Sequence, residues 1–340
     1  MKFSHKKRVF FHFYITAWLL MLLVAFAATP SESAGVLRPT SGPVKVYVTI
    51  FIVDVDEISS ANQSFDANVY LQYRWRDPKL AHKGSEAIVR PLNDVWNPKI
   101  YVVNQQKIWT TLPEIVTIAP DGEVLYRQRV WGSFSQPLEL KDFPFDRQVF
   151  SVQLAAVGFT PDQVELLPDT TPGSGISQKL SVVDWSVIGY KSEPRPFKPI
   201  PAMNAISGFA FSFEARREIG YFIVKVIIPL IFIVAMSWVV FWIDPMESGT
   251  QISVAITTML TLIAYRFSID SSLPKVSYLT RLDYFILLST ILIFASLVEV
   301  VFTSTLAKAE KLSQARAIDR RMRLLFPLAF VIVTIKSLIL

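Results

Sequence analysis

Hydrophobic and polar positions follow two different patterns in the two parts of the chain. From Val44 to about Arg217, short apolar stretches alternate with turn signals, and in 44–50 every second side chain is apolar. This period of two is typical of β-strands that bury one face. A second such strand, 69–75, has a more polar opposite face with Asn68, Tyr70, Gln72 and Arg74. The turn sequence Ala-Pro-Asp-Gly at 119–122 joins two more strand candidates, and together these strands predict a β-sandwich.

After Arg217, long apolar runs replace the alternation. Residues 221–243 are apolar apart from Lys225 and Ser237, and at ~1.5 Å per residue this run can span a bilayer. Three further runs predict a bundle of four transmembrane helices, at about 220–243, 250–269, 283–306 and 322–340. The sequence thus predicts an all-β domain at 35–217, followed by an all-α membrane domain at 218–340.

The ends and links of these segments predict the topology. Basic residues precede an apolar run at 9–28, as in a secretory signal, so we expect 1–34 to be removed; a retained membrane anchor is the alternative. Basic side chains gather between the third and fourth helices, which the positive-inside rule places in the cytoplasm. We expect a multi-pass protein of the cell (inner) membrane, with the β domain periplasmic or extracellular and the C-terminus outside. The basic residues are Lys308, Lys311, Arg316, Arg320, Arg321 and Arg323.

Composition removes several classes of function. The 340 residues are 51% hydrophobic and only 18% charged, with a mean hydropathy of +0.38, as in membrane proteins. The chain has no cysteine and three histidines, of which only His82 lies beyond the expected signal. These counts argue against an enzyme, a metal site or a cofactor. The net charge of +6 is dispersed or lies beside apolar helices, so nucleic acid is not an expected partner.

The second predicted helix carries an unusual stripe. At ~100° per residue, its members fall within about 80° of one another, with hydroxyls in the cytoplasmic half and apolar side chains in the outer half. Such a stripe fits a pore with a hydrophobic gate at Leu260 and Phe267, although small hydroxylic residues also serve close helix packing. Because one helix cannot enclose a pore, this hypothesis requires a ring of subunits. The stripe is Ser253, Thr257, Leu260, Ala264 and Phe267.

Five motifs, in order, carry a resemblance to a known family: Trp-Arg-Asp-Pro-Lys-Leu at 75–80, Trp-Asn-Pro at 96–98, Phe-Pro-Phe-Asp at 143–146, Arg217 leading to Ile228-Pro229, and Leu-Pro-Lys-Val-Ser-Tyr at 273–278. The chain resembles the pentameric ligand-gated ion channels of the Cys-loop receptor superfamily. It is most similar to bacterial members, which lack the disulfide, since the two cysteine positions hold Gln136 and Phe150.

The resemblance implies a homopentamer in lipid, with an agonist site between neighbouring β domains and a pore lined by the second helices. A box of aromatic rings suits an ammonium ligand, whereas Arg127 and Arg195 suit a carboxylate, and protons are a third possible agonist. The candidate agonist-binding residues are Tyr70, Tyr126, Arg127, Phe159, Tyr190 and Phe197.

The resemblance also places residues at the domain junction. Asp146 and Arg217 are expected to form a coupling pair there, together with the loop residues Pro274, Lys275 and Tyr278. A static structural ion pair is the alternative interpretation of Asp146 and Arg217.

The link between the first two helices bears on selectivity. Its two acids have no neighbouring base, so Glu247, with Thr250, predicts a cytoplasmic mouth that favours monovalent cations. The alternatives are an anion-selective channel and a membrane-anchored periplasmic sensor that conducts nothing.

Overall fold

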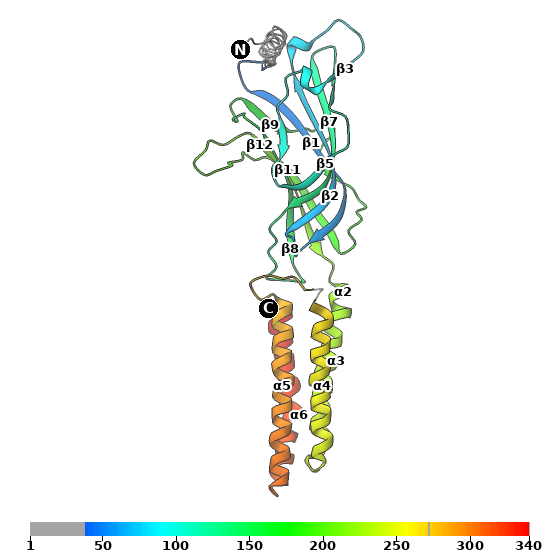
Figure 1. Cartoon of the computed structure of the whole chain (residues 1–340), viewed down its shortest axis with the longest axis vertical. Helices are drawn as coiled ribbons and strands as arrows, with labels where there is room; N and C mark the ends of the chain where they lie inside the picture. The colour runs from blue at the N-terminus through cyan, green and yellow to red at the C-terminus, as the bar shows by residue number, and fades with distance from the viewer. Residues whose placement is uncertain (1–37, 271–272, 340) are drawn as a thin grey trace, which may run out of the picture.

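A β domain lies at one end of an elongated molecule and a bundle of helices at the other (Figure 1). This computed structural model describes residues 38–270 and 273–339. The expected signal segment, 1–34, lies outside the described residues. The order of a β-sandwich followed by a helical region is as the sequence predicts, so the predicted fold class is confirmed.

Two sheets form the β domain in the described part of the chain. The larger sheet has the order β10-β1-β2-β7-β6-β3, with β5 paired to β7 and β9 to β1, and the smaller has the order β11-β12-β8-β4. The larger sheet contains β1 (Val44–Ser59), β2 (Ser64–Arg76), β3 (Ile88–Pro91), β5 (Gln105–Thr110), β6 (Ile115–Ile118), β7 (Glu123–Ser135), β9 (Val164–Pro168) and β10 (Gly175–Ile176). The smaller contains β4 (Ile100–Val102), β8 (Arg147–Ala156), β11 (Trp185–Pro194) and β12 (Gly208–Arg217).

The predicted alternation sets which face of each strand enters the core. In β1, Val46, Val48 and Ile50 are fully buried, and in β2 the apolar side chains at 69, 71, 73 and 75 are buried as well. β1 and β2 pair antiparallel with Ile50 opposite Leu71, so the apolar sides of both strands share one face of the sheet.

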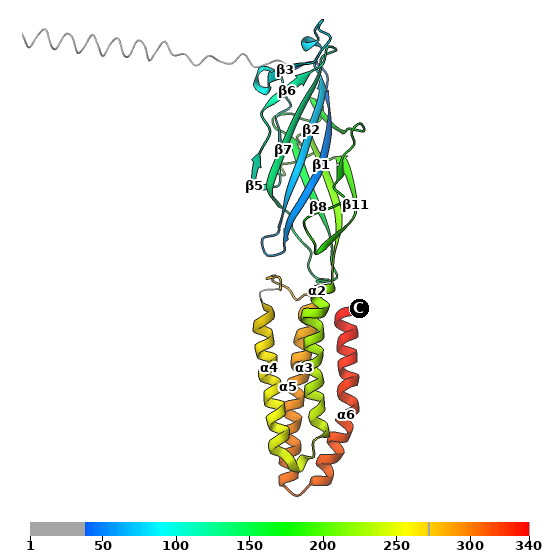
Figure 2. The same ribbon diagram turned by 90° about the vertical axis from the view of Figure 1, so that its right-hand side faces the viewer.

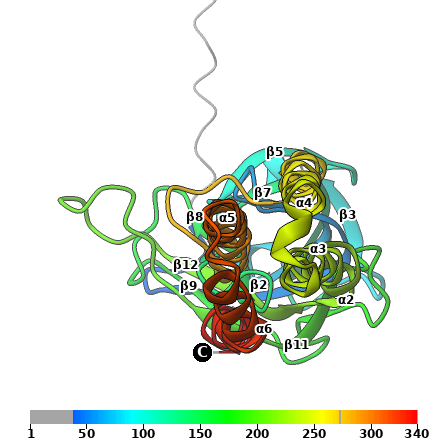
Figure 3. The same cartoon turned by 90° about the horizontal axis from the view of Figure 1, so that it is seen from below.

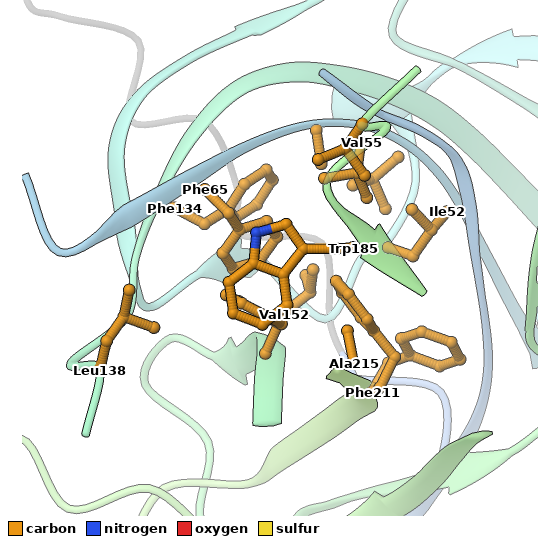
Figure 4. Packing of buried hydrophobic residues seen from close by; sticks show 14 of the residues in the cluster. Ile52, Val55, Phe65, Phe134, Leu138, Val152, Trp185, Phe211 and Ala215 are labelled. Atoms are coloured by element: carbon orange, nitrogen blue, oxygen red, sulfur yellow. The ribbon is translucent and has the colours of Figure 1, made fainter. Parts of the chain in front are cut away.

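Aromatic side chains fill the space between the sheets (Figure 4). The Phe65 ring stacks on Phe134 with centroids 5.2 Å apart and meets Phe150 edge-on at 5.4 Å. Trp185, from β11, packs edge-on against Phe150 at 5.5 Å. These rings come from both sheets, so the β domain closes a core of its own.

The predicted turn at 119–122 joins β6 to β7. Its last residue, Gly122, has a φ of 82°, and a Cβ there would lie 2.5 Å from the Asp77 carbonyl oxygen. Only glycine fits both the left-handed backbone and this close approach.

The helical bundle follows β12 directly. Its first helix consists of α2 (Gly220–Phe222), a π-helical segment (Ile223–Ile227), α3 (Ile228–Val239) and a 3-10 turn (Val240–Trp242). A second 3-10 turn (Pro245–Glu247) leads into α4 (Ser248–Ile269), and α5 (Arg281–Lys308) and α6 (Leu312–Thr334) follow, with a π-helical end at Ile335–Ile339. Three helices of the described residues are long and apolar enough to cross a membrane: Gly220–Trp242, Pro245–Ile269 and Arg281–Lys308.

The fourth helix differs from its predicted bounds. The apolar run predicts a start at about 322, whereas α6 begins at Leu312, so most of the basic residues expected in a link lie on the helix. Helical hydrogen bonds do not require apolar side chains, and the amphipathic first half packs through Ala315 and Asp319, which are buried. The connection from α5 shortens to 309–311.

The four helices run side by side, with α4 and α6 at opposite corners of the bundle and α3 and α5 between them (Figures 2 and 3). α4 packs against α3 and α5, and α6 packs mainly against α5. The last turns of α6 reach the end of the bundle that faces the β domain (Figure 2).

Candidate pore, agonist surface and domain junction

α4 has two faces with opposite surroundings. One face is buried against the rest of the bundle and consists of Gln251, Ala255, Thr258, Leu262 and Ile269. The members of the predicted stripe are all exposed, with Leu260 at 61% and Phe267 at 80%. At ~100° per residue, the centre of the stripe lies about 190° around the helix axis from the centre of the buried face. The stripe therefore points away from the other helices of its own chain.

Hydroxyl groups on α4 bond to the helix backbone. The Thr257 hydroxyl donates to the Ser253 carbonyl oxygen at 2.8 Å, and the Thr258 hydroxyl donates to the Val254 carbonyl oxygen at 2.9 Å. These neighbouring threonines have the same local bond, yet Thr257 is exposed and Thr258 is fully buried. Because its donor is used, the Thr257 oxygen can only accept further hydrogen bonds from its surroundings.

The link before α4 carries two acidic residues, one in an ion pair and one without. Asp244 pairs with Arg316 of α6 at 2.8 Å, and its carboxylate also accepts a hydrogen bond from the Met246 amide at 3.0 Å. Glu247 is exposed and has no ion pair within the described residues, and Thr250 is exposed one turn further on. The arginine from α6 leaves Glu247 as the uncompensated charge of this link.

The candidate agonist residues of the larger sheet lie on two faces. Tyr70 of β2 lies opposite Arg129 of β7, and Gln72 lies opposite Arg127, whose guanidinium donates to the Gln72 side chain at 3.2 Å. Tyr70 and Arg127 therefore share the outer face. Tyr126 lies on the inner face, because it pairs with Tyr73 and stacks on its ring at 5.9 Å.

Tyr126 is thus separated from Tyr70 by the sheet. Its ring lines a cavity of about 280 Å³ together with Tyr73, Tyr101 and Gln128, and Gln128 donates a hydrogen bond to its hydroxyl at 3.2 Å. Burial raises the pKa of Tyr126 above its ordinary value. The period of two along β7 already implied that Tyr126 and Arg127 face opposite ways.

The candidate residues beside the smaller sheet form two groups, with Phe159 and Phe197 in one and Tyr190 in the other. The Phe159 carbonyl accepts a hydrogen bond from the Ser207 amide at 2.9 Å, and Phe197 bridges to the adjacent Ile206, so these two segments meet. The Phe159 ring packs edge-on against Trp96 at 5.8 Å and is half-buried. Phe197 lines a hollow of about 30 Å³ whose other members include Val103, Gln153 and Arg195.

Tyr190 lies apart from this group. It stacks on Phe211 at 5.6 Å and lines a different groove, with Ile176 and Lys179. Seven residues of extended chain, up to ~23 Å, separate Tyr190 from Phe197. In one chain the candidates therefore occupy separate surfaces.

The junction between the domains contains a buried ion pair. The Arg217 guanidinium donates to both Asp146 carboxylate oxygens, at 2.8 and 3.2 Å, and the two side chains are 5% and 1% exposed. Gln148 donates to the same carboxylate at 2.8 Å, and the Arg217 guanidinium lies over the rings of Phe143 and Trp185. All charges at this site are thus paired and enclosed. Trp185 is not among the residues predicted for the junction, because nothing in its neighbourhood in sequence indicates this contact.

The loop that carries Asp146 also contacts the helices. Phe143 meets Phe222 of α2 edge-on at 4.9 Å, and its carbonyl accepts a hydrogen bond from the Leu282 amide at 3.2 Å. The Tyr278 hydroxyl accepts a hydrogen bond from the Leu140 amide at 2.9 Å. Pro274 is half-buried, and Lys275 is exposed without an ion pair within the described residues.

Comparison with known families agrees with this arrangement. Residues 34–218 match the neurotransmitter-gated ion-channel ligand binding domain, and residues 226–314 match the neurotransmitter-gated ion-channel transmembrane region. The chain belongs to the neurotransmitter-gated ion-channel family, so the family predicted from the motifs is confirmed. It is a membrane-embedded, ligand-gated channel subunit with an extracellular ligand-binding domain, and it is not an enzyme.

Proposed function

We propose that five copies of this chain surround a pore lined by α4, through which monovalent cations cross the inner membrane when a small molecule binds the β domains. The exposed stripe of α4 supports this proposal most directly, since it faces away from the helices of its own chain. Cyclic symmetry turns five such stripes toward one axis. The β domain is then periplasmic or extracellular, and the C-terminus lies on the same, outer side of the membrane.

The two halves of the stripe have different roles. Ser253 and Thr257 line a wet section, where the Thr257 hydroxyl, with its donor already used, presents lone pairs to permeant cations. Leu260 and Phe267 form apolar rings that close the pore by excluding water, with Ala264 between them.

Glu247 and Thr250 form the cytoplasmic mouth. Five uncompensated Glu247 carboxylates concentrate cations there, while the charge of Asp244 is neutralised by Arg316. Glu247→Gln is expected to weaken the preference for sodium over chloride, and Glu247→Asp to keep it. Reversal of wild-type current near the chloride potential in asymmetric sodium chloride would contradict this assignment and support an anion channel.

The agonist site lies between neighbouring subunits. One side is formed by Phe159 and Phe197 with Arg195, and the other by Tyr70 and Arg127 on the outer face of the larger sheet. The hollow at Phe197 is lined by Arg195 and by no acidic residue, which favours a small carboxylate over an ammonium ligand. Tyr126 and Tyr190 are not assigned to this site, because Tyr126 lies on the inner face of the larger sheet and Tyr190 lines a separate groove. An agonist response to amines that survives Arg195→Gln would contradict the carboxylate assignment, and a response to pH alone would indicate protons.

Binding is transmitted through the junction. Asp146 and Arg217 hold the loop of the Phe-Pro-Phe-Asp motif, 143–146, to the end of β12. Pro274, Lys275 and Tyr278 lie between α4 and α5 in the chain, and the Tyr278 hydroxyl bonds to the Leu140 amide just before that loop. A shift of this paired unit changes the position of α4.

The absence of cysteine from the sequence allows a direct test of the pore. Thr257→Cys and Thr258→Cys form a matched pair, because the wild-type side chains have the same size and the same hydrogen bond. In planar bilayers, a charged methanethiosulfonate reagent is expected to block current through Thr257→Cys channels by more than about tenfold and to leave Thr258→Cys channels unchanged.

The outcomes of this experiment separate the alternatives. Equal modification of both variants would exclude this orientation of α4. Protein that is pentameric by mass measurement, yet silent across pH, amines and carboxylates, would support the non-conducting sensor instead.

A further inference from the structure

Three polar side chains from three different helices meet inside the bundle. Gln251 comes from α4, Glu299 from α5 and Asp319 from α6. Gln251 and Asp319 are 0% and 1% exposed, and both Glu299 carboxylate oxygens are shielded from solvent. The Gln251 amide donates to the Ile243 carbonyl oxygen at 2.8 Å and reaches an Asp319 oxygen at 3.5 Å. The cluster joins the proposed pore helix to the two helices behind it.

Hydrogen-bond donors are missing at this cluster. In the described part of the chain, no donor reaches Gln251 Oε1, either carboxylate oxygen of Glu299, or Asp319 Oδ1. The carboxyl groups of Glu299 and Asp319 lie within hydrogen-bonding reach of each other. A hydrogen bond between two carboxyl groups requires a proton, since two carboxylates can only accept.

Nearby charges do not supply the missing donors. The Arg323 guanidinium donates to the Phe241 carbonyl at 2.9 Å and lies over the Trp242 ring, 5.4 Å from its centroid. Arg316 pairs with Asp244 at 2.8 Å, so its guanidinium is already engaged outside the cluster. Within the described residues, neither Glu299 nor Asp319 forms an ion pair with any of these groups.

We propose that Glu299 and Asp319 bind one proton between them, as a neutral carboxyl group that donates to a carboxylate. The proton supplies the donor that no side chain supplies, and it removes the repulsion between two adjacent carboxylates in a low-dielectric interior. A calcium ion suits the cluster less well, since it takes 6–8 oxygen ligands and the three side chains offer only four free oxygens.

The site gives the channel a dependence on pH at the end of the bundle remote from the β domain. Loss of the proton places two negative charges between α5 and α6, directly beside Gln251 of α4. Because the folded protein holds a proton that the unfolded chain releases at neutral pH, the free energy of unfolding falls as pH rises. The effect on current rests on the proposed function of α4, whereas proton binding does not.

Infrared spectroscopy of the full-length protein in lipid detects the proton directly. Wild-type protein at neutral pH is expected to show the carbonyl stretch of a protonated carboxyl group that resists deuterium exchange. Glu299→Gln and Asp319→Asn each supply an amide donor in place of the proton, so both variants are expected to fold and to lose this band. Glu310→Gln, in the exposed connection before α6, is the matched control and is expected to keep it.

Current recordings then test the consequence. In inside-out patches, raising the bath from about pH 6 to about pH 9 is expected to change open probability by roughly fivefold or more in wild-type and Glu310→Gln channels. Glu299→Gln and Asp319→Asn are expected to abolish this dependence.

Other results overturn the proposal. One is the absence of the protonated carboxyl band from wild-type protein, and another is its survival in both variants. A third is a shift of the carboxylate bands when sodium is replaced by N-methylglucamine, which would indicate that a metal ion is bound in place of the proton. Protein that shows the band but passes no current would instead contradict the proposed channel function.

Discussion

The β domain and the helical bundle treat large apolar side chains in opposite ways. In the β domain, Phe65 and Phe150 are completely buried between two sheets of the same chain. In the bundle, Phe232 is 65% exposed, and Leu260 and Leu324 are exposed to a similar extent. The β domain closes its core alone, whereas the bundle presents apolar surface that lipid and neighbouring subunits must cover.

Polar groups show the same contrast. At the junction, Arg217 and Asp146 satisfy each other with the help of Gln148, so the pair is complete within one chain. In the described part of the bundle, no donor reaches either carboxylate oxygen of Glu299 or Asp319 Oδ1. A buried polar group without a partner in its own chain needs a physical explanation, which the proposed proton supplies here.

The largest expected effect tests the difference in packing. Phe65→Ala removes a ring that contacts three other phenylalanines and is expected to lower the free energy of unfolding by about 4 kcal/mol. Phe232→Ala, in contrast, is expected to change it by less than about 0.5 kcal/mol, because its side chain is mostly outside the core. Thermal unfolding of both purified variants, followed by tryptophan fluorescence, checks this, and equal losses would contradict the comparison.

The junction is expected to give the next largest effect. Arg217→Gln leaves the Asp146 carboxylate buried without its counter-charge and is expected to cost about 3 kcal/mol of stability. The double variant Arg217→Gln with Asp146→Asn removes both charges and is expected to recover part of that loss. A coupling role further requires that the double variant, though folded, needs a higher agonist concentration for half-maximal current. If the double variant gates normally, the pair of Asp146 and Arg217 has only a structural role.

A change at the gate is expected to be smaller in free energy. Leu260→Ala opens the apolar ring and is expected to lower the agonist concentration for half-maximal current by roughly tenfold. Leu324→Ala in α6, which is similarly exposed but distant from the stripe, serves as control. Equal shifts in dose–response recordings would mean that Leu260 does not line the constriction.

The smallest expected effect concerns acid stability of the β domain. Burial acts to raise the pKa of Asp169, but hydrogen bonds from Arg74 and the Thr171 amide outweigh it, so the pKa of Asp169 lies below its ordinary value. The resulting stability is present at neutral pH and is lost as pH falls below about 4. Asp169→Asn is therefore expected to cost about 1 kcal/mol at pH 7 and to flatten the fall in Tm between about pH 5 and pH 3. An unchanged acid profile would contradict this.

Much of the architecture was determined by the sequence itself. The alternation at 44–50 and 69–75 predicts strands with the observed buried faces, because a strand repeats every two residues. Apolar runs predict the first three long helices to within a few residues, since a bilayer requires a minimum length of apolar chain. The apolar run predicted the wrong start for α6, because the first half of this helix is amphipathic and carries basic residues.

Contacts between distant segments were decided only by the tertiary structure. The spacing of Gln251, Glu299 and Asp319 reveals no relation among them, because it depends on how three helices pack. The separation of Tyr190 from Phe197, and the neutralisation of Asp244 by Arg316, likewise depend on which elements become neighbours. Periodicity is a local property of the chain and can be taken from sequence, whereas the partners of a buried charge are set by packing between distant elements.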